Sequence, residues 1–200
     1  MLDKLLFGKN VTSYMIIFIN GSFGVGKSTV AEKLVEQLPN SLLFDPEMVG
    51  YFLGPIVRPI TEFEDFQDLP MWRPLVVETA RQLKQAYGRT LIMPQTIWFR
   101  PYFEEIMEGL RQFEPDLFHF CLTARPETIY KRLRERGHTP EANPWVYQRV
   151  EPCVTTFQAP DFAVQISNED RSPDEVVSEI LSRVGAIQTD QMVNGLKGYC

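Results

Sequence analysis

A glycine-rich loop between an apolar run and a helical pattern constrains this sequence more than any other feature. Residues 15–20 form the apolar run, and residues 27–38 carry the helical pattern. The segment between them has the spacing G-x4-G-K-[ST], which predicts a phosphate-binding loop where it joins a buried strand to a helix. The residues expected to bind a nucleotide are Gly21, Ser22, Phe23, Gly24, Val25, Gly26, Lys27, Ser28 and Thr29.

The glycines, the lysine and the serine of this loop each suit the binding of phosphate and Mg²⁺ for a different chemical reason. Glycines allow positive φ angles and place no Cβ between the backbone and an anion. The N–H groups of the loop and of the following helix N-terminus then point at a phosphate. Lys27 is expected to bind the β- and γ-phosphates, and the Ser28 hydroxyl to bind Mg²⁺. The loop predicts binding of ATP with Mg²⁺; the alternative is a glycine-rich turn with an incidental lysine.

Composition narrows the range of partners. The 200 residues suffice for one domain with its own core, and the net charge of −6 leaves no excess of positive charge for nucleic acid or an anionic membrane. The apolar runs are far shorter than the ~20 residues of a membrane span, and the N-terminus is a poor signal peptide. Three cysteines without metal spacing suit a reducing compartment. We expect a cytoplasmic protein with a small-molecule substrate, and a homodimer stays open.

Apolar runs and helical patterns alternate along the chain. The expected strands are 15–20, 41–44, 90–93, 117–123 and 162–166. The expected helices are 27–38, 71–87, 102–113, 126–136, 146–157 and 172–186, with a short helical turn at 48–53 that Pro55 ends. This order predicts an α/β fold in three layers, with a five-stranded parallel sheet between helices. Ligands of such sheets bind outside the carboxyl ends of the strands.

The domain boundaries follow from the same pattern. Residues 1–14 precede the first strand and are expected to be an extension, while residues 15–186 form the single domain. Residues 187–200 are polar and contain glycine, which predicts a flexible tail.

Asp45 is the first candidate for catalysis, because it follows the second strand at its carboxyl end. A carboxylate there could accept a proton from an attacking hydroxyl or bind Mg²⁺ through water. The alternative is a cap for the helical turn that follows, and the two roles are compatible. The third strand ends in Gln95 and Thr96, which offer only neutral hydrogen bonds where many phosphate-loop enzymes have an aspartate. Either Asp45 supplies the carboxylate for the metal, or catalysis is slow.

Arginines cluster around the fourth helical pattern. Arg132 and Arg136 share one helix face at a spacing of i, i+4, which would let both reach one phosphate chain. Residues 132–149 therefore predict a lid that closes over the nucleotide and excludes water. The alternative is a basic helix face exposed to solvent.

The acceptor of the phosphoryl group is expected between the second and third strands. Gln67, Trp72 and Arg73 lie there, and an aromatic ring beside an arginine could stack on a ring and hold a polar group. Gln95 and Thr96 are expected to contact the same substrate. The alternative for Trp72 is a core residue of the long helix, with Arg73 at its surface.

Several segments together resemble one known family. MIIFINGSFGVGKS, FDPEMVGY, EDFQDLPMWR, LIMPQTI, RPYFEEI and FHFCLTARPETIYKRLRER are similar to the bacterial tunicamycin-resistance proteins, within the shikimate-kinase and chloramphenicol-phosphotransferase branch of P-loop kinases. The resemblance covers about residues 15–184. It implies ATP and Mg²⁺ at the phosphate loop, Asp45 as the base, and Arg132 and Arg136 in the lid. It also implies protection against a nucleoside antibiotic, by phosphorylation or by binding.

Three functions are compatible with these patterns to different degrees. The first is a kinase that phosphorylates a hydroxyl of a nucleoside or amino-sugar antibiotic. The second is a protein that binds such a ligand in the presence of ATP without phosphoryl transfer, which the missing third-strand aspartate favours. The third, a polynucleotide kinase, is disfavoured by the acidic net charge.

Overall fold

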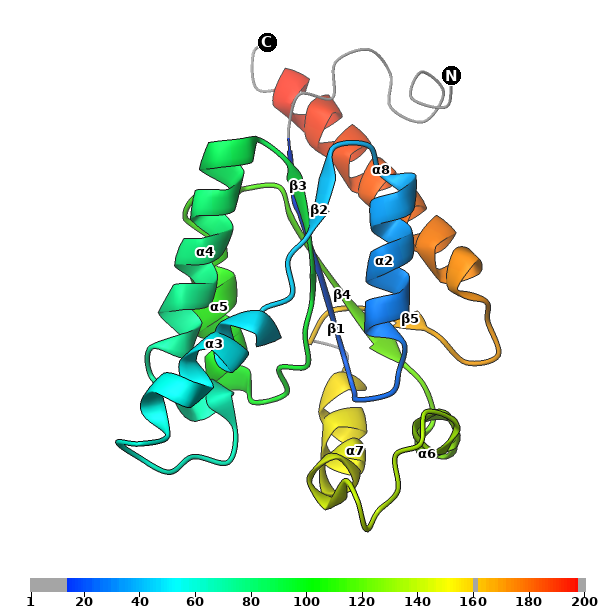
Figure 1. The fold of residues 1–200 in the computed structure, drawn as a ribbon. Helices are drawn as coiled ribbons and strands as arrows, with labels where there is room; N and C mark the ends of the chain where they lie inside the picture. The colour runs from blue at the N-terminus through cyan, green and yellow to red at the C-terminus, as the bar shows by residue number, and fades with distance from the viewer. Residues whose placement is uncertain (1–13, 160–161, 198–200) are drawn as a thin grey trace.

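The structure is a computed structural model that describes residues 14–159 and 162–197, and its centre is a parallel sheet (Figure 1). Five strands pair in the order β2-β3-β1-β4-β5, all in parallel. They are β1 (Ile16–Gly21), β2 (Ser41–Leu43), β3 (Thr90–Pro94), β4 (Leu117–Thr123) and β5 (Val164–Ser167). The prediction of a five-stranded parallel sheet is confirmed.

Helices cover both faces of this sheet. They are α2 (Lys27–Gln37), α3 (Glu47–Val57), α4 (Trp72–Tyr87), α5 (Arg100–Arg111), α6 (Pro126–Glu135), α7 (Pro144–Phe157) and α8 (Pro173–Lys197), with a 3-10 turn η1 at Phe66–Asp68. In Figure 1, α2 and α8 lie on one side of the sheet, and α4 and α5 on the other. The three-layer α/β architecture expected from the sequence is therefore present.

The central strand β1 is buried on both faces, as its uninterrupted apolar sequence requires in a parallel sheet. Ile17 and Ile19 belong to the core beneath α2 and α8. Ile16 and Phe18 belong to the core beneath α4 and α5. Apolar packing on both faces thus fixes β1, and with it the position of its carboxyl end, between the two helix layers.

Two helices extend further than the sequence predicts. Helix α3 runs through Pro55 to Val57, where the sequence predicted a break. Pro55 and Tyr51 both lie on the exposed side of α3, so water can reach the Tyr51 carbonyl that Pro55 leaves without an N–H donor. Helix α8 continues to Lys197, beyond the predicted end at residue 186, because each of its two glycines costs a helix only about 1 kcal/mol. The predicted extension 1–14 lies almost wholly outside the described residues.

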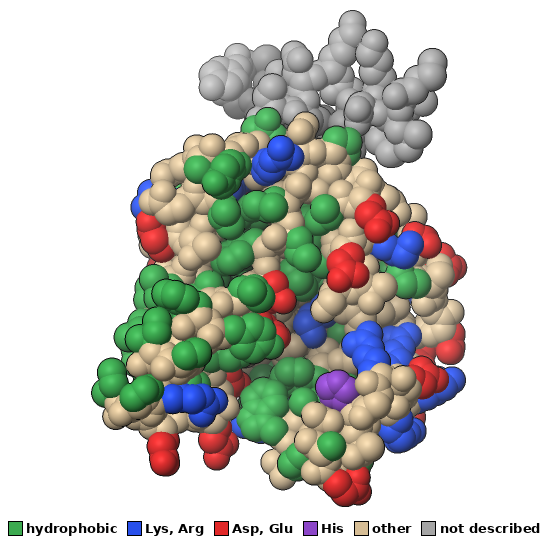
Figure 2. Space-filling view, viewed as in Figure 1, with side chains coloured by type: hydrophobic (Ala, Val, Ile, Leu, Met, Phe, Trp, Pro, Cys, Tyr) green, Lys and Arg blue, Asp and Glu red, His purple; other side chains and the backbone are tan. Residues whose placement is uncertain are grey.

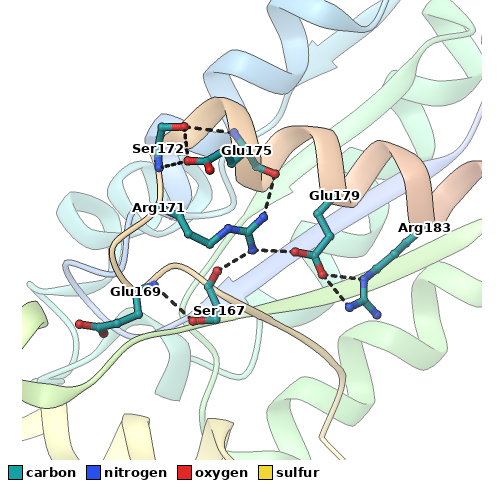
Figure 3. Close-up of polar contacts among 7 residues, drawn as sticks. All are labelled: Ser167, Glu169, Arg171, Ser172, Glu175, Glu179 and Arg183. Carbon is teal, nitrogen blue, oxygen red and sulfur yellow. Dashed lines mark hydrogen bonds and ion pairs between the residues drawn. The ribbon is translucent and has the colours of Figure 1, made fainter.

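The start of α8 is held by a reciprocal cap (Figure 3). The Glu175 N–H donates to Ser172 Oγ over 3.3 Å, and the Ser172 N–H donates to Glu175 Oε2 over 2.8 Å. Arg171 donates to the Ser167 carbonyl over 3.0 Å and to Glu179 over 2.6 Å. Ser172 and Glu175 thus form a capping box. These bonds hold the loop between β5 and α8 in one conformation.

Across the described part of the chain, no helix combines the length and the apolar character that crossing a membrane requires.

Candidate nucleotide and acceptor site

The phosphate-binding loop follows the carboxyl end of β1, at the lower end of the sheet in Figure 1. Gly24 and Gly26 have φ angles of 74° and 107°, and α2 begins directly afterwards at Lys27. At Gly21, a Cβ would lie 2.6 Å from the Leu122 carbonyl oxygen of the neighbouring strand. Glycine is therefore required for backbone reasons at these positions, as expected for a loop that surrounds an anion.

Side chains from neighbouring strands support the beginning of this loop. The Thr96 hydroxyl donates to the Gly21 carbonyl over 2.9 Å. Asn20 Oδ1 accepts from the N–H groups of Gly21 at 2.9 Å and of Ile97 at 3.0 Å. Asn20 and Thr96 are both buried, so these bonds are shielded from water. The loop is thus tied to the end of β3 before any ligand binds.

The far end of the loop is held by Asn168 and Arg132. Asn168 Nδ2 and Arg132 Nη1 both donate to the Val25 carbonyl, over 2.6 Å and 3.1 Å. Arg132 Nη2 also donates to the Asn168 carbonyl over 2.8 Å. Sequence reasoning did not assign Asn168 a role; its only signal was its place just after β5. Arg132 therefore joins the phosphate loop to the loop after β5, and its expected contact with phosphates stays a prediction.

A cavity of about 190 Å³ lies in front of the phosphate loop, and Figure 2 shows acidic and basic side chains on this hollowed face. It lies beyond the carboxyl ends of the strands, as predicted. Its lining residues are Phe23, Gly24, Lys27, Ser28, Asp45, Glu47, Pro94, Thr96, Leu133, Arg136, His138 and Val146. The structure therefore brings Lys27, Ser28, Asp45, Thr96 and Arg136 from the predicted set into one cavity.

Burial, and to a smaller extent neighbouring charges, shift the pKa values of the ionisable groups in this cavity. Loss of hydration lowers the pKa of Lys27 to about 8, and its Nζ donates to the Ser22 carbonyl over 3.0 Å. Desolvation raises the pKa of Asp45, although its bond with the Glu47 N–H opposes the shift. Desolvation also raises the pKa of Glu47, with a further contribution from the Asp45 charge. Opposite charges thus face each other where they are poorly hydrated.

Glu47 is the residue that sequence reasoning missed. It was considered only as part of the turn after Asp45, yet its carboxylate lines the same cavity as Lys27. Asp45 Oδ1 accepts from the Glu47 N–H over 2.9 Å, so Asp45 also caps α3. The capping and the cavity-facing roles of Asp45 are therefore compatible. Two carboxylates thus line this cavity, whereas the end of β3 contributes the neutral Thr96.

The predicted lid consists of the end of α6, the connecting turn and the start of α7. Arg136 and His138 from this segment line the phosphate cavity. The Trp145 ring packs edge-on against the Phe23 ring of the phosphate loop, with centroids 5.3 Å apart. Lid and phosphate loop therefore touch at this cavity.

Of the residues predicted to contact the acceptor, Trp72 lies in the core and Gln67 lines a second cavity. Trp72 is buried in the core, and its indole N–H donates to the Pro46 carbonyl over 3.2 Å, so the core interpretation is correct and substrate stacking on this ring is not. Arg73 donates to the Gln67 carbonyl over 2.7 Å and pairs with Glu105. Gln67 lies in the wall of a second cavity.

Gln95 has a buried side chain whose amide nitrogen and oxygen both lack a protein partner among the described residues. Buried amides usually form hydrogen bonds, so the Gln95 amide could still donate to and accept from a bound molecule. It directly precedes Thr96, which lines the phosphate cavity. Its prediction as a substrate residue stays a prediction.

Comparison with known proteins now decides the family. A family model described as an AAA domain matches residues 16–160. The chain belongs to this AAA domain family. No curated protein matches the sequence. Among solved structures, the Deinococcus radiodurans tunicamycin resistance protein is 27% identical, with a TM-score of 0.72 over 86% of this chain and 96% of that chain. The resemblance read from the sequence is confirmed.

Two further structures share the fold of this AAA domain protein. A gluconokinase from Sinorhizobium meliloti 1021 is 16% identical, with a TM-score of 0.65 over 90% of this chain and 97% of that chain. The shikimate kinase from Acinetobacter baumannii, solved in complex with shikimate, is 17% identical, with a TM-score of 0.61 over 86% of this chain and 94% of that chain. The fold is therefore that of the P-loop kinases.

Proposed function

We propose that this protein is a kinase that transfers the γ-phosphoryl group of ATP to a hydroxyl of a small molecule, either a nucleoside or an amino-sugar antibiotic. One observation carries the proposal: Asp45 and Glu47 share a cavity with Lys27 and Ser28 of the phosphate loop. Phosphoryl transfer needs a base for the hydroxyl and cations for the phosphates within the same space. The likeness to a tunicamycin resistance protein supports an antibiotic as the acceptor.

The residues present fit ATP and Mg²⁺. The positive φ angles of Gly24 and Gly26 and the start of α2 form a cradle of N–H groups for phosphate oxygens. The Ser28 hydroxyl and the carboxylates of Asp45 and Glu47 are the oxygen ligands that Mg²⁺ prefers, directly or through water. When bound, the metal would neutralise charge on the phosphate oxygens.

The protein residues then have separate parts in the reaction. Asp45 accepts the proton of the acceptor hydroxyl, whose oxygen forms a bond to the γ-phosphorus of ATP while the bond to the ADP oxygen breaks. Lys27 and Arg136 stabilise the negative charge on the transferring group. Arg132 acts as a positioning residue, because it holds the Val25 carbonyl of the loop.

Replacing Asp45 with asparagine is expected to reduce transfer at least about 10²-fold, because an amide cannot accept the proton. Asparagine Oδ1 can still accept from the Glu47 N–H, so the fold should be retained. Mass spectrometry of a panel containing tunicamycin, other nucleosides and amino-sugar antibiotics, incubated with protein and ATP·Mg²⁺, would detect one added phosphoryl group. An Asp45→Asn protein that turns over as fast as the parent would remove Asp45 from catalysis.

A second function is favoured by the end of β3, where Gln95 and Thr96 occupy positions without a carboxylate. The protein would then bind its ligand in the presence of ATP without transferring phosphate. ATP-dependent retention of one panel compound with no change in its mass would select this function. The cytoplasmic location and the homodimer stay predictions.

ATP binding is expected to weaken above pH 8. The ammonium form of Lys27 attracts phosphates, and the pKa of this group is about 8, so the charged fraction falls as pH rises through that value. Affinity should drop up to about tenfold per pH unit until the higher pKa of the bound state is reached, as calorimetry between about pH 7 and 10 would measure. Lys27→Arg, which stays charged, should show a flat profile; an equally steep one would assign the effect to another group.

A further inference from the structure

A second cavity, of about 240 Å³, lies beside the phosphate cavity and is not explained by nucleotide binding. Its walls come from η1, the segment after β3, the start of α5 and the middle of α7. The lining residues are Asp65, Gln67, Asp68, Trp98, Phe99, Tyr102 and Arg149. Carboxylates and aromatic rings thus dominate the walls.

A hydrogen bond joins the wall of this second cavity to the wall of the phosphate cavity. Gln67 Nε2 donates to the Thr96 carbonyl over 2.9 Å, and Thr96 lines the phosphate cavity. The Asp65 charge also raises the pKa of Glu47, so the two carboxylates lie within electrostatic reach of each other. A molecule in the second cavity could therefore present a hydroxyl toward Asp45 and Glu47.

The two aspartates of the cavity retain hydrogen-bonding capacity. Asp65 Oδ1 accepts from the Gln67 N–H over 3.0 Å, and Asp68 Oδ1 accepts from the Tyr102 hydroxyl over 3.2 Å. A carboxylate has two oxygens with about four acceptor sites, so each of these bonds leaves room for a ligand donor. Both groups accept, and neither can donate when ionised.

The nearby arginines are largely engaged elsewhere. Arg73 pairs with Glu105 over 2.5 Å, and its guanidinium lies 4.0 Å from the centroid of the Tyr102 ring. Arg149 lies 4.1 Å from the centroid of the Trp145 ring and 3.8 Å from a Glu64 oxygen. Arg73 thus has an acidic partner outside the cavity, whereas Arg149 lines the cavity and its charge also acts on Asp65. Two aspartates against one arginine leave the lining of this cavity with a net negative charge.

Besides the aspartates, three aromatic residues of the cavity wall can contact a ligand: Trp98, Phe99 and Tyr102. Phe99 is 48% exposed, and its ring packs edge-on against Tyr102 at 4.7 Å. Trp98 lies beside them in the same wall. Aromatic faces attract cations and cover the apolar face of a ring, while carboxylates accept from ammonium and hydroxyl groups.

We propose that this cavity, defined by Asp65, Asp68, Trp98, Phe99 and Tyr102, binds the acceptor as an ammonium-bearing, hydroxyl-rich ring of the amino-sugar class, and that it rejects anionic acceptors. Only the identification of the bound ring as the phosphoryl acceptor rests on the proposed kinase function. Like charges brought together at a binding site are strongly unfavourable, so the same aspartates that attract an ammonium group exclude a carboxylate.

Three sugars that share one ring test this preference without ATP. Binding of D-glucosamine, D-glucose and D-glucuronate would be measured by calorimetry and by Trp fluorescence. Glucosamine is expected to bind about tenfold more tightly than glucuronate, with glucose between them. The difference should shrink at high salt, because exposed charges are screened. Equal affinities, a preference for glucuronate, or no saturable binding of glucosamine would each overturn the proposal.

Two variants locate the effect. Asp65→Asn and Asp68→Asn keep the hydrogen bonds to Gln67 and Tyr102 but remove the charge, and each should lower the ratio of glucosamine to glucuronate affinity about threefold. Asp174→Asn removes the same charge on α8, where Asp174 pairs with Lys33, and should leave the ratio unchanged. An equal effect of all three variants would show a general charge effect and contradict the assignment.

The outcome is separable from that of the kinase proposal. If glucosamine is preferred but no compound gains a phosphoryl group, the cavity is a binding site and the kinase proposal fails. If an anionic compound is phosphorylated at a rate that Asp65→Asn and Asp68→Asn leave unchanged, the kinase proposal stands and the amino-sugar cavity fails.

Discussion

Lys27→Ala is expected to reduce phosphoryl transfer by about 10³-fold, the largest effect on activity of any substitution in the phosphate cavity. Among the residues that the structure describes, Lys27 is the only lysine in the lining of that cavity, and it faces the carboxylates of Asp45 and Glu47. Alanine removes the cation that would neutralise the transferring group. It also leaves the two carboxylates facing the phosphates without an opposing charge, so ATP should bind more weakly as well.

Lys33→Ala is the matched control, because Lys33 lies on the same helix α2 but pairs with Asp174 at the surface. Its activity should equal that of the parent protein. Single-turnover measurements at saturating ATP would separate weaker binding from slower transfer. A Lys27→Ala protein that retains more than about a tenth of the parent rate would contradict the role of the cavity as the phosphoryl-transfer site.

Gly21→Ala is expected to lower the free energy of unfolding by about 3 kcal/mol, the largest effect on stability. Gly21 has a φ of 145°, which L side chains rarely adopt, and a Cβ there would lie 2.6 Å from the Leu122 carbonyl oxygen. The obstacle is the backbone of β4, which cannot turn away as a side chain could. Movement of β1 from β4 would also disturb the bonds that Thr96 and Asn20 make to Gly21.

Urea unfolding monitored by circular dichroism measures this change, with Gly185→Ala as the control. Gly185 lies inside α8, and a Cβ there meets no atom within 4 Å. Alanine at Gly185 should stabilise the protein by up to about 1 kcal/mol, since it favours the helix. A Gly21→Ala protein as stable as the parent would show that β1 and β4 can separate at little cost.

The site residues differed in how far sequence could place them. Lys27 and Ser28 were predictable because their roles depend on local spacing after β1. Arg132 and Arg136 were predictable as one helix face, but only Arg136 lines the cavity, because the carbonyls of Val25 and Asn168 accept from Arg132. Burial of Trp72 was one of two interpretations, and its bond to the Pro46 carbonyl decided between them.

The sequence by itself determined the phosphate loop, the parallel sheet and the end of the sheet at which ligands bind. These features depend on residues close together in the chain: glycines with positive φ, apolar runs of strand length, and helix signals such as Ser172 and Glu175. Only the tertiary structure decided that Glu47 shares a cavity with Lys27, and that Asp65 and Asp68 form a second cavity with Trp98. The physical reason is that a side chain's charge and hydration depend on what packs against it, and those neighbours come from distant segments whose relative positions no local spacing encodes.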